Sequence, residues 1–327
     1  MKNTYKKGVV LVASLYLSLL SFGTTLRSAS SMEEGLIVPE VEFQKSSDLP
    51  MVYVYNAPES AIDVRYNYHW EILRTALEKT KFKYGEFGMV KSQVMLESRQ
   101  TFEMINATDA LSVMYLGTTP KLERNLIGIH IPVDKNLGGY SIFLVRKELK
   151  DDFRNITTLD ELKKFTFGLG LGRIDVGILQ SNGFKVVTGS SYEGLFEMLV
   201  NKRFDIYLRE SGEIFNELEE RKTTLPDLCI EENVCLYYPR PMYFWFQKTA
   251  QGRMLAERAE EGMRMMIKDG TYDQIFDKYQ QAKIEKLRLN ARRIFTIRNP
   301  FLVPETPFEN KQLWFDPKTY QPIRKTE

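Results

Sequence analysis

The sequence predicts an α/β protein built as two lobes. Its 327 residues exceed what one ordinary hydrophobic core organises. Short apolar runs alternate with helical patterns on both sides of a breaker cluster at 136–139, which is the order expected of mainly parallel sheets. A later extended run at 236–247, LYYPRPMYFWFQ, would return the chain to its first half. We therefore expect two mixed, mainly parallel sheets joined by two crossings.

Before the breaker cluster, strands and helices alternate. The run MVYVYN alternates β-branched and aromatic residues as a strand does, and Trp70, Leu73 and Leu77 share one helical face. The expected elements are strands at 51–56, 82–90, 110–116 and 126–133, and helices at 70–80 and 93–106. Ligands of such sheets bind beyond the carboxyl ends of the strands, which points to the loops 56–66 and 117–124.

The same alternation continues after the cluster. Capping boxes at 158–161 and 190–193 open two helices, and Asp175 is expected to cap a third. The expected elements are strands at 140–146, 165–169, 184–188 and 204–208, and helices at 159–165, 175–182, 194–203 and 212–222.

Two consecutive helices are expected over residues 251–280. Lys268 lies in the last turn of the first helix, Gly270 can adopt a positive φ, and Thr271 caps the second helix. The segment GMRMMIKDGTYDQIFDKYQ resembles the end of family 3 extracellular solute-binding proteins, the periplasmic binding proteins of amino-acid-type ABC importers. The segments TTLDELKKFTFGLG, GILQSNGFKVV and LFEMLVNKRFDIYLRE are similar to the second lobe of that family, in the same order.

This resemblance covers about residues 48–280 and implies the type II periplasmic-binding-protein fold. It implies a first lobe at 48–135 and 241–280 and a second lobe at 138–238. Residues 281–327 are an extension that we expect to wrap the surface, with 283–293 continuing a basic helix.

The first thirty residues predict a signal peptide. Three lysines precede an uncharged apolar run at 9–22, and Ser28 and Ser30 fit a cleavage site. The run is shorter than the roughly 20 residues of a spanning helix, although an uncleaved anchor is the alternative. We expect a monomeric, periplasmic protein.

Charge and cysteine content limit the partners. Beyond residue 30 the chain holds 41 basic and 43 acidic residues, so there is no electrostatic case for nucleic acid. Cys229 and Cys235 are the only cysteines, and in an oxidising compartment they predict one disulfide. Their spacing, without a neighbouring histidine, makes a poor zinc site. No metal or cofactor is expected.

The glycine turn at 168–172 could suggest a nucleotide site, because glycines before a helix expose amide donors to anions. It is not GxGxxG, and no acidic residue follows at the required distance. We interpret it as a tight strand-to-helix turn. A contact from Gly170 to a carboxylate of the solute is the alternative.

Arginines near the expected cleft are the most specific indication of a binding site, because a guanidinium binds a carboxylate through two parallel hydrogen bonds. For each of them, a surface position or a structural ion pair is the alternative. The five are Arg65, Arg99, Arg124, Arg173 and Arg209.

The family resemblance ranks these arginines. It implies that an arginine after Thr119 holds the α-carboxylate of the solute, and Arg124 is the match with two residues inserted. It also implies a carboxylate for the amino group near Arg209, where an arginine would repel an ammonium ion. Either Glu210 substitutes for that carboxylate or the solute is not an ordinary amino acid.

Three further residues, Asp63, Tyr66 and Trp70, are expected to line the cleft, although aromatic residues are more often core. The expected function is capture of a small polar or anionic solute for an inner-membrane ABC permease. A sensory module without transport and a dehydratase-like enzyme using Glu210, Glu59 or Asp63 are the alternatives.

Overall fold

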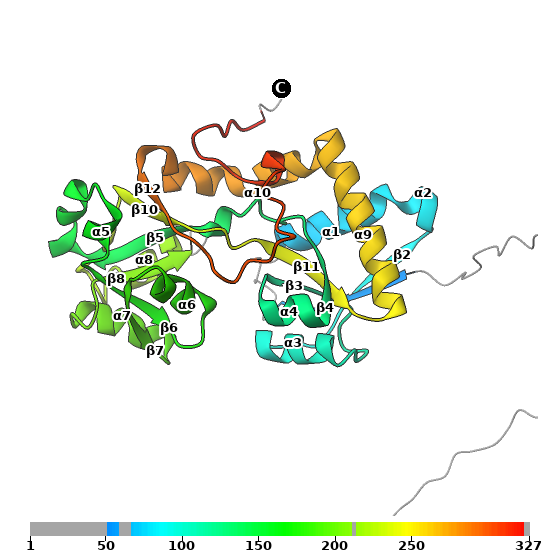
Figure 1. Ribbon diagram of the computed structural model, residues 1–327, viewed down its shortest axis with the longest axis horizontal. Helices are drawn as coiled ribbons and strands as arrows, with labels where there is room; N and C mark the ends of the chain where they lie inside the picture. The colour runs from blue at the N-terminus through cyan, green and yellow to red at the C-terminus, as the bar shows by residue number, and fades with distance from the viewer. Residues whose placement is uncertain (1–50, 59–66, 211–213, 324–327) are drawn as a thin grey trace, which may run out of the picture. The chain divides into compact units, whose positions relative to one another are not determined.

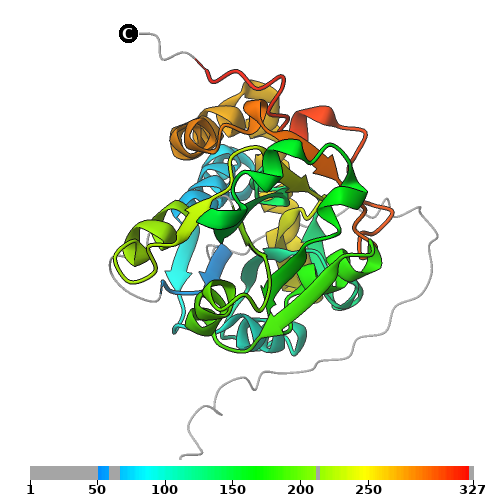
Figure 2. The same ribbon diagram turned by 90° about the vertical axis from the view of Figure 1, so that its left-hand side faces the viewer.

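The computed structural model describes residues 51–58, 67–210 and 214–323 (Figures 1 and 2). The predicted signal peptide and the loop that carries Asp63, Arg65 and Tyr66 lie outside these residues. Within them, no helix is both long enough and apolar enough to cross a membrane.

Among the residues that the structure describes, the first lobe contains five strands, of which one, β11 (Met242–Gln247), runs antiparallel between two others. The other four are β1 (Met51–Tyr55), β2 (Phe87–Lys91), β3 (Val113–Gly117) and β4 (Leu126–Ile129). β1 and β2 pair in parallel, and β11 lies antiparallel between β3 and β4. The two parts meet at Ser112, whose amide donates to the Val54 carbonyl at 2.9 Å. The pairing therefore gives a two-stranded sheet, β2–β1, and a three-stranded sheet, β3–β11–β4, which this hydrogen bond joins edge to edge in the order β2–β1–β3–β11–β4.

Six helices accompany this sheet: α1 (Asn67–Lys79), α2 (Lys81–Tyr84), α3 (Glu97–Ile105), α4 (Pro120–Asn125), α9 (Ala250–Asp269) and α10 (Thr271–Leu287). Gly270, with φ of 82°, ends α9 as expected. The strand expected at 82–90 begins too early, because residues 81–84 form α2 and β2 starts only after Gly85, whose φ is 75°.

The second sheet repeats this order with two additional strands. Its strands are β5 (Tyr140–Arg146), β6 (Thr166–Gly170), β7 (Lys185–Gly189), β8 (Ile206–Glu210), β9 (Leu228–Ile230), β10 (Val234–Tyr237) and β12 (Arg293–Thr296). The order is β7–β6–β8–β5–β10–β12, and β9 also pairs with β5. β5 is antiparallel to β8, as β11 is to β3 in the first sheet.

The helices of this lobe are α5 (Leu159–Leu162), α6 (Ile174–Ser181), α7 (Tyr192–Val200) and α8 (Ile214–Arg221). The capping box at Thr158 is confirmed. Three caps were placed wrongly by sequence. Ser191, rather than Ser190, caps α7, Asp175 lies inside the first turn of α6, and Gly270, rather than Thr271, is the N-cap of α10.

The chain crosses between the sheets at 130–139, from β4 to β5, and again at 238–241, from β10 to β11. Each of these two crossings leads into the strand that lies antiparallel inside the sheet it enters. The chain passes between the lobes a third time at 288–292, from α10 to β12. The prediction of an α/β fold of the type II periplasmic-binding-protein class, with mixed sheets, is confirmed. The sheets are not mainly parallel, however, because four pairings of the described strands are parallel and five are antiparallel. The residue limits expected for the lobes stay a prediction.

The extension departs from the expected continuous basic helix. α10 ends at Leu287, because Arg288 adopts a left-handed conformation with φ of 50°. The chain then forms β12, which pairs in parallel with β10 at the edge of the second sheet. Part of the extension is therefore sheet rather than surface wrapping.

The predicted disulfide is not formed, and both cysteines are free thiols. Cys229 of β9 pairs with Val145 of β5, whereas Leu236 pairs with Ser141, which places Cys235 beside Ile142. Three residues along a strand span about 10 Å, and a disulfide needs Cα atoms within about 7 Å. The prediction relied on the closeness of the two cysteines in sequence. In the fold, β9 and β10 pair with different residues of β5, which separates the cysteines.

We predict that Gly262→Ala destabilises the protein. A Cβ at Gly262 of α9 would overlap the carbonyl of Ala76 in α1, so the helices must separate. The expected loss in unfolding free energy, measured by urea denaturation, is about 2 kcal/mol. Glu257→Ala, at an exposed position of α9, is the control and should cost less than about 0.5 kcal/mol. Equal losses in the two variants would contradict this packing.

Candidate functional site

A cavity of about 850 Å³ lies beyond the carboxyl ends of strands from both sheets. From the first sheet it is lined by Asn56, which follows β1, and Gly117, which ends β3. From the second it is lined by Gly172 and Arg173, between β6 and α6. Both crossings and α10 complete the lining, so the cavity is shared by the two lobes.

One wall of the cavity is aromatic. Trp70 of α1 packs against Tyr55 with ring centroids 4.8 Å apart, and His69 stacks on Tyr115 of β3 at 3.7 Å. Burial, and secondarily the charge of Lys283, lowers the pKa of His69 to about 3. The imidazole is therefore neutral at physiological pH, and the wall presents flat, uncharged rings.

The opposite side of the cavity holds a cluster of charges around Asp175 of α6. Its carboxylate accepts hydrogen bonds from the Tyr238 hydroxyl at 2.7 Å and from Arg173 Nε at 3.1 Å. Nε of Arg240, in the second crossing, lies 3.7 Å from the same carboxylate. Burial alone would raise the pKa of Asp175, but the two guanidiniums and the hydroxyl bring it below its usual range. Two arginines thus meet at one buried anion in the cavity wall.

Arg240 also joins the two crossings. Its backbone amide donates to Oδ1 of Asn136 at 2.8 Å, and its Nη2 donates to the Gly138 carbonyl at 3.4 Å. Asp134, which lines the cavity, accepts the amides of Asn136 and Gly138. Burial raises the pKa of Asp134 despite these hydrogen bonds. The floor of the cavity is therefore made by the crossings themselves.

Three of the predicted site residues line the cavity, namely Trp70, Thr119 and Arg173. The Thr119 hydroxyl accepts the amide of Leu122 and caps α4. Direct contact of these three residues with a solute stays a prediction.

Three other predicted residues are not among those that line the cavity. Arg124 lies exposed at the end of α4, because the inserted residues form a helix that carries it away from Thr119. Arg99 is exposed on α3 and pairs with Glu103. Gly170 ends β6, and its carbonyl accepts the amide of Arg173 at 3.3 Å, which fits the strand-to-helix turn.

Arg209 of β8 is buried and paired with Glu217 of α8. Its Nε donates to Oε2 of Glu217 at 2.7 Å, and its Nη2 donates to Oε1. The guanidinium lies 4.9 Å from the centroid of the Tyr207 ring. Arg209 is thus part of a structural ion pair, the alternative that sequence analysis left open. Glu210 is the last residue of β8.

Sequence reasoning missed Arg240 and Asp134, and assigned Asp175 only a capping role. Arg240 lies between Pro239 and Pro241 in the crossing. A charge in a short Pro-flanked crossing is the signal that could have identified it, because such a crossing passes beside the cleft.

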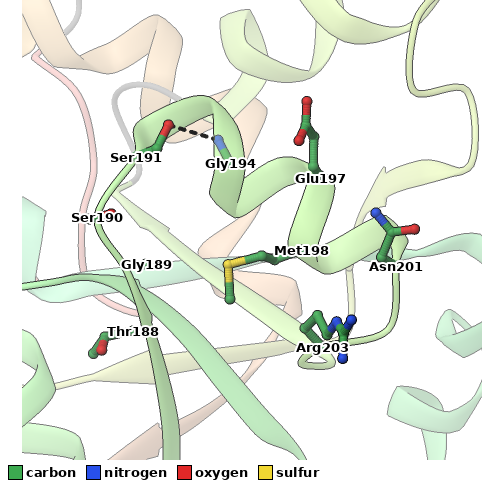
Figure 3. A pocket seen from close by; sticks show the side chains of 9 residues that line it. All are labelled: Thr188, Gly189, Ser190, Ser191, Gly194, Glu197, Met198, Asn201 and Arg203. Atoms are coloured by element: carbon green, nitrogen blue, oxygen red, sulfur yellow. Dashed lines mark hydrogen bonds between the residues drawn. The ribbon is translucent and has the colours of Figure 1, made fainter.

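A second hollow of about 600 Å³ lies in the second lobe alone, between the end of β7 and α7 (Figure 3). Ser191 caps α7 there through the Gly194 amide at 3.2 Å, and Glu197 and Arg203 stand on its rim. It gathers no cluster comparable to the one around Asp175. The cavity between the lobes is therefore the candidate site.

No protein-family model and no curated protein matches the chain. Among solved structures, an ancestral arginine-binding protein bound to arginine is 16% identical with a TM-score of 0.47, covering 70% of this chain and 98% of that one. A histidine kinase sensor domain with similarity to periplasmic binding proteins is 14% identical with a TM-score of 0.46, covering 71% and 97%.

An arginine-specific periplasmic binding protein of Salmonella typhimurium is 16% identical, with a TM-score of 0.44, covering 69% of this chain and 98% of that one. The chain is thus similar to amino-acid solute-binding proteins over about 70% of its length.

We predict that Asp175→Asn costs about 3 kcal/mol of unfolding free energy at pH 7, because it leaves two guanidiniums beside a buried neutral group. The folded pKa of Asp175 is depressed, so its stabilisation is present above the unfolded value near 3.9 and is lost as pH falls below it. Urea denaturation at pH 7 and pH 3 should therefore show the difference from wild type shrinking in acid.

Asp160→Asn is the control for this prediction, because the side chain of Asp160 is 90% exposed. It should change stability by less than about 0.5 kcal/mol at either pH. A deficit of Asp175→Asn that is constant with pH would show that the charge of Asp175 contributes nothing.

Proposed function

We propose that this chain is an exported, periplasmic solute-binding protein without catalytic activity. It captures a small polar or anionic solute, amino-acid-like or an organic acid, between two lobes at 48–135 with 241–280 and at 138–238. The single observation that carries this proposal is the cavity shared by the carboxyl ends of strands from both sheets. Its volume lies within the range of small-molecule sites.

The charges of the cavity support an anionic group on the solute. Arg173 and Arg240 converge from the second lobe and the second crossing, and Lys283 of α10 adds a third cation to the lining. The lining also holds the carboxyl groups of Glu97, Asp134 and Asp175. Guanidinium binds carboxylate strongly where water is excluded. The remainder of the solute would pack against the rings of Trp70 and Tyr115, which offer dispersion without charge.

Capture would proceed by closure of the lobes around the solute. The crossings supply the few residues that can change angle, and closure then buries the solute against both lobes. The filled form would be presented to an inner-membrane ABC permease. This order lets the protein discriminate solutes, because a wrong solute leaves buried polar groups without partners.

We predict that a panel of amino acids, organic acids and small peptides contains at least one compound that raises the melting temperature. A ligand present at one hundred times its Kd adds about 2.7 kcal/mol to the unfolding free energy, which a thermal-shift assay detects readily. If no compound in the three classes stabilises the protein, the proposal fails.

We further predict that Arg173→Gln abolishes most of that shift. Arg173 lines the cavity and is solvent-accessible, so the variant should fold. A weakening of binding by about a hundred-fold is expected for loss of one charge-assisted contact. Arg154→Gln, with a side chain 66% exposed and outside the cavity, is the matched control. Equal shifts in the two variants would contradict a role for Arg173.

A further inference from the structure

The C-terminal extension continues beyond the end of α10, and this part, residues 288–323, is what 'the extension' means below. Its first residues are fixed to the second lobe. β12 continues the second sheet beside β10. Arg292, which is buried, donates from Nε to the Leu287 carbonyl at 2.8 Å and from Nη1 to the carbonyls of Glu231 and Val234. Its guanidinium also lies 3.7 Å from the Glu231 carboxylate. This end of the extension is therefore fixed to the second lobe by sheet pairing and by a buried cation.

The extension then leaves β12 and contacts both crossings (Figure 1). Nδ2 of Asn299 donates to the Pro239 carbonyl at 2.8 Å, one residue before Arg240. The Phe315 amide donates to the Lys135 carbonyl at 2.8 Å, one residue after Asp134. Each hydrogen bond therefore holds the immediate neighbour of a residue that lines the cavity.

The end of the extension is fixed to α10. The Tyr320 hydroxyl donates to Oδ1 of Asp277 at 2.7 Å, and the Ile323 amide donates to Oδ2 at 2.6 Å. Asp277 lies less than one turn before Tyr279 and Gln280, which line the cavity. The Phe315 ring, 4% exposed, packs against Phe276 of α10 and Tyr140 of β5.

The extension is also stiff for its length. Five of its residues are prolines, which fix φ and cost less entropy on ordering than other residues. It contributes no residue to the cavity lining among the residues that the structure describes. Its contacts nevertheless end beside both crossings and beside α10, three segments that contribute residues to the cavity lining.

We propose that the extension positions the binding site by bracing both crossings and α10 from outside the cavity. The inference rests on the proposed function for the identity of the site, but the mechanical claim does not need a solute. Hinge motion concentrates in a few residues, so a third chain segment bonded to both crossings must break or deform when the lobes separate. The brace keeps the open form close to the geometry that binds solute.

Two asparagines provide a matched comparison. Asn299 makes one hydrogen bond to the second crossing and accepts the Phe301 amide at 2.9 Å. Asn182, directly after α6, donates to the Arg298 carbonyl and accepts the Arg298 amide, and its Nδ2 also donates to the Ile178 carbonyl and the Ser181 hydroxyl. Both side chains hold the extension, but only Asn299 holds it to a crossing.

The test measures the separation of the lobes without any solute. Nitroxide labels are placed by Lys121→Cys on α4 and Lys185→Cys on β7, both exposed, in a background carrying Cys229→Ser and Cys235→Ala. Pulsed electron paramagnetic resonance then gives the distribution of label distances. We expect Asn299→Ala to widen this distribution about two-fold, and Asn182→Ala to leave it unchanged.

Asp277→Ala is a second test at the other end of the extension, because it removes both oxygens that accept the Tyr320 hydroxyl and the Ile323 amide. It should widen the distribution as Asn299→Ala does. In the same variants, the amides of Asn136 and Gly138, which bond to Asp134, should exchange hydrogen about ten-fold faster.

Unchanged distributions in both Asn299→Ala and Asp277→Ala would overturn the brace, as would equal widening in Asn182→Ala. Either result leaves the solute screen unaffected. Conversely, if no compound in the solute screen stabilises the protein, the proposed function is wrong, whereas the distances between the labels are unaffected.

Discussion

The structure depends on the polar contacts that Arg240 makes where the chain returns to its first lobe. Its backbone amide is held by Asn136 of the other crossing, its Nη2 by the Gly138 carbonyl, and its Nε faces Asp175 of α6. One residue therefore joins both crossings to the second lobe. Because its side chain is only 11% exposed, these contacts are poorly replaced by water.

This arrangement explains how a cavity with several charges can exist beside the hydrophobic core, whose largest buried cluster includes residues of both lobes. Asp175 is stabilised as an anion by two guanidiniums and a hydroxyl, while Asp134 accepts two backbone amides. Trp70, Tyr115 and a neutral His69 form the facing wall. A solute with one anionic group and a flat or apolar body would match the guanidiniums with its anionic group and the aromatic wall with its body. The extension adds support from outside, at the neighbours of the residues that form the floor.

Much of the fold was readable from local patterns, because strand alternation, capping boxes and the glycine after α9 are short-range signals. The capping box at Thr158 and the left-handed Gly270 are confirmed. β12 was not predicted, because its pairing with β10 depends on a partner about sixty residues away in sequence, which periodicity does not reveal. The disulfide was wrong for the same reason, since pairing with β5 sets the separation of Cys229 and Cys235.

The site was harder to predict than the fold. Trp70, Thr119 and Arg173 line the cavity, and their contact with a solute stays a prediction. Arg124 and Arg209 do not, because a helix carries the first away and a buried glutamate pairs with the second. Arg240 escaped notice because its role arises from contacts with Asn136 and Asp175, which lie 104 and 65 residues earlier in the chain.

The central claim is that one anion-binding cavity lies between the lobes, on a floor made by the crossings. A crystal structure of protein purified without refolding, inspected for retained small-molecule density, addresses it most directly. The account predicts density between Trp70 and the pair Arg173 and Arg240. Retained density at the surface hollow beside α7, with the space between the lobes filled by protein side chains, would contradict it.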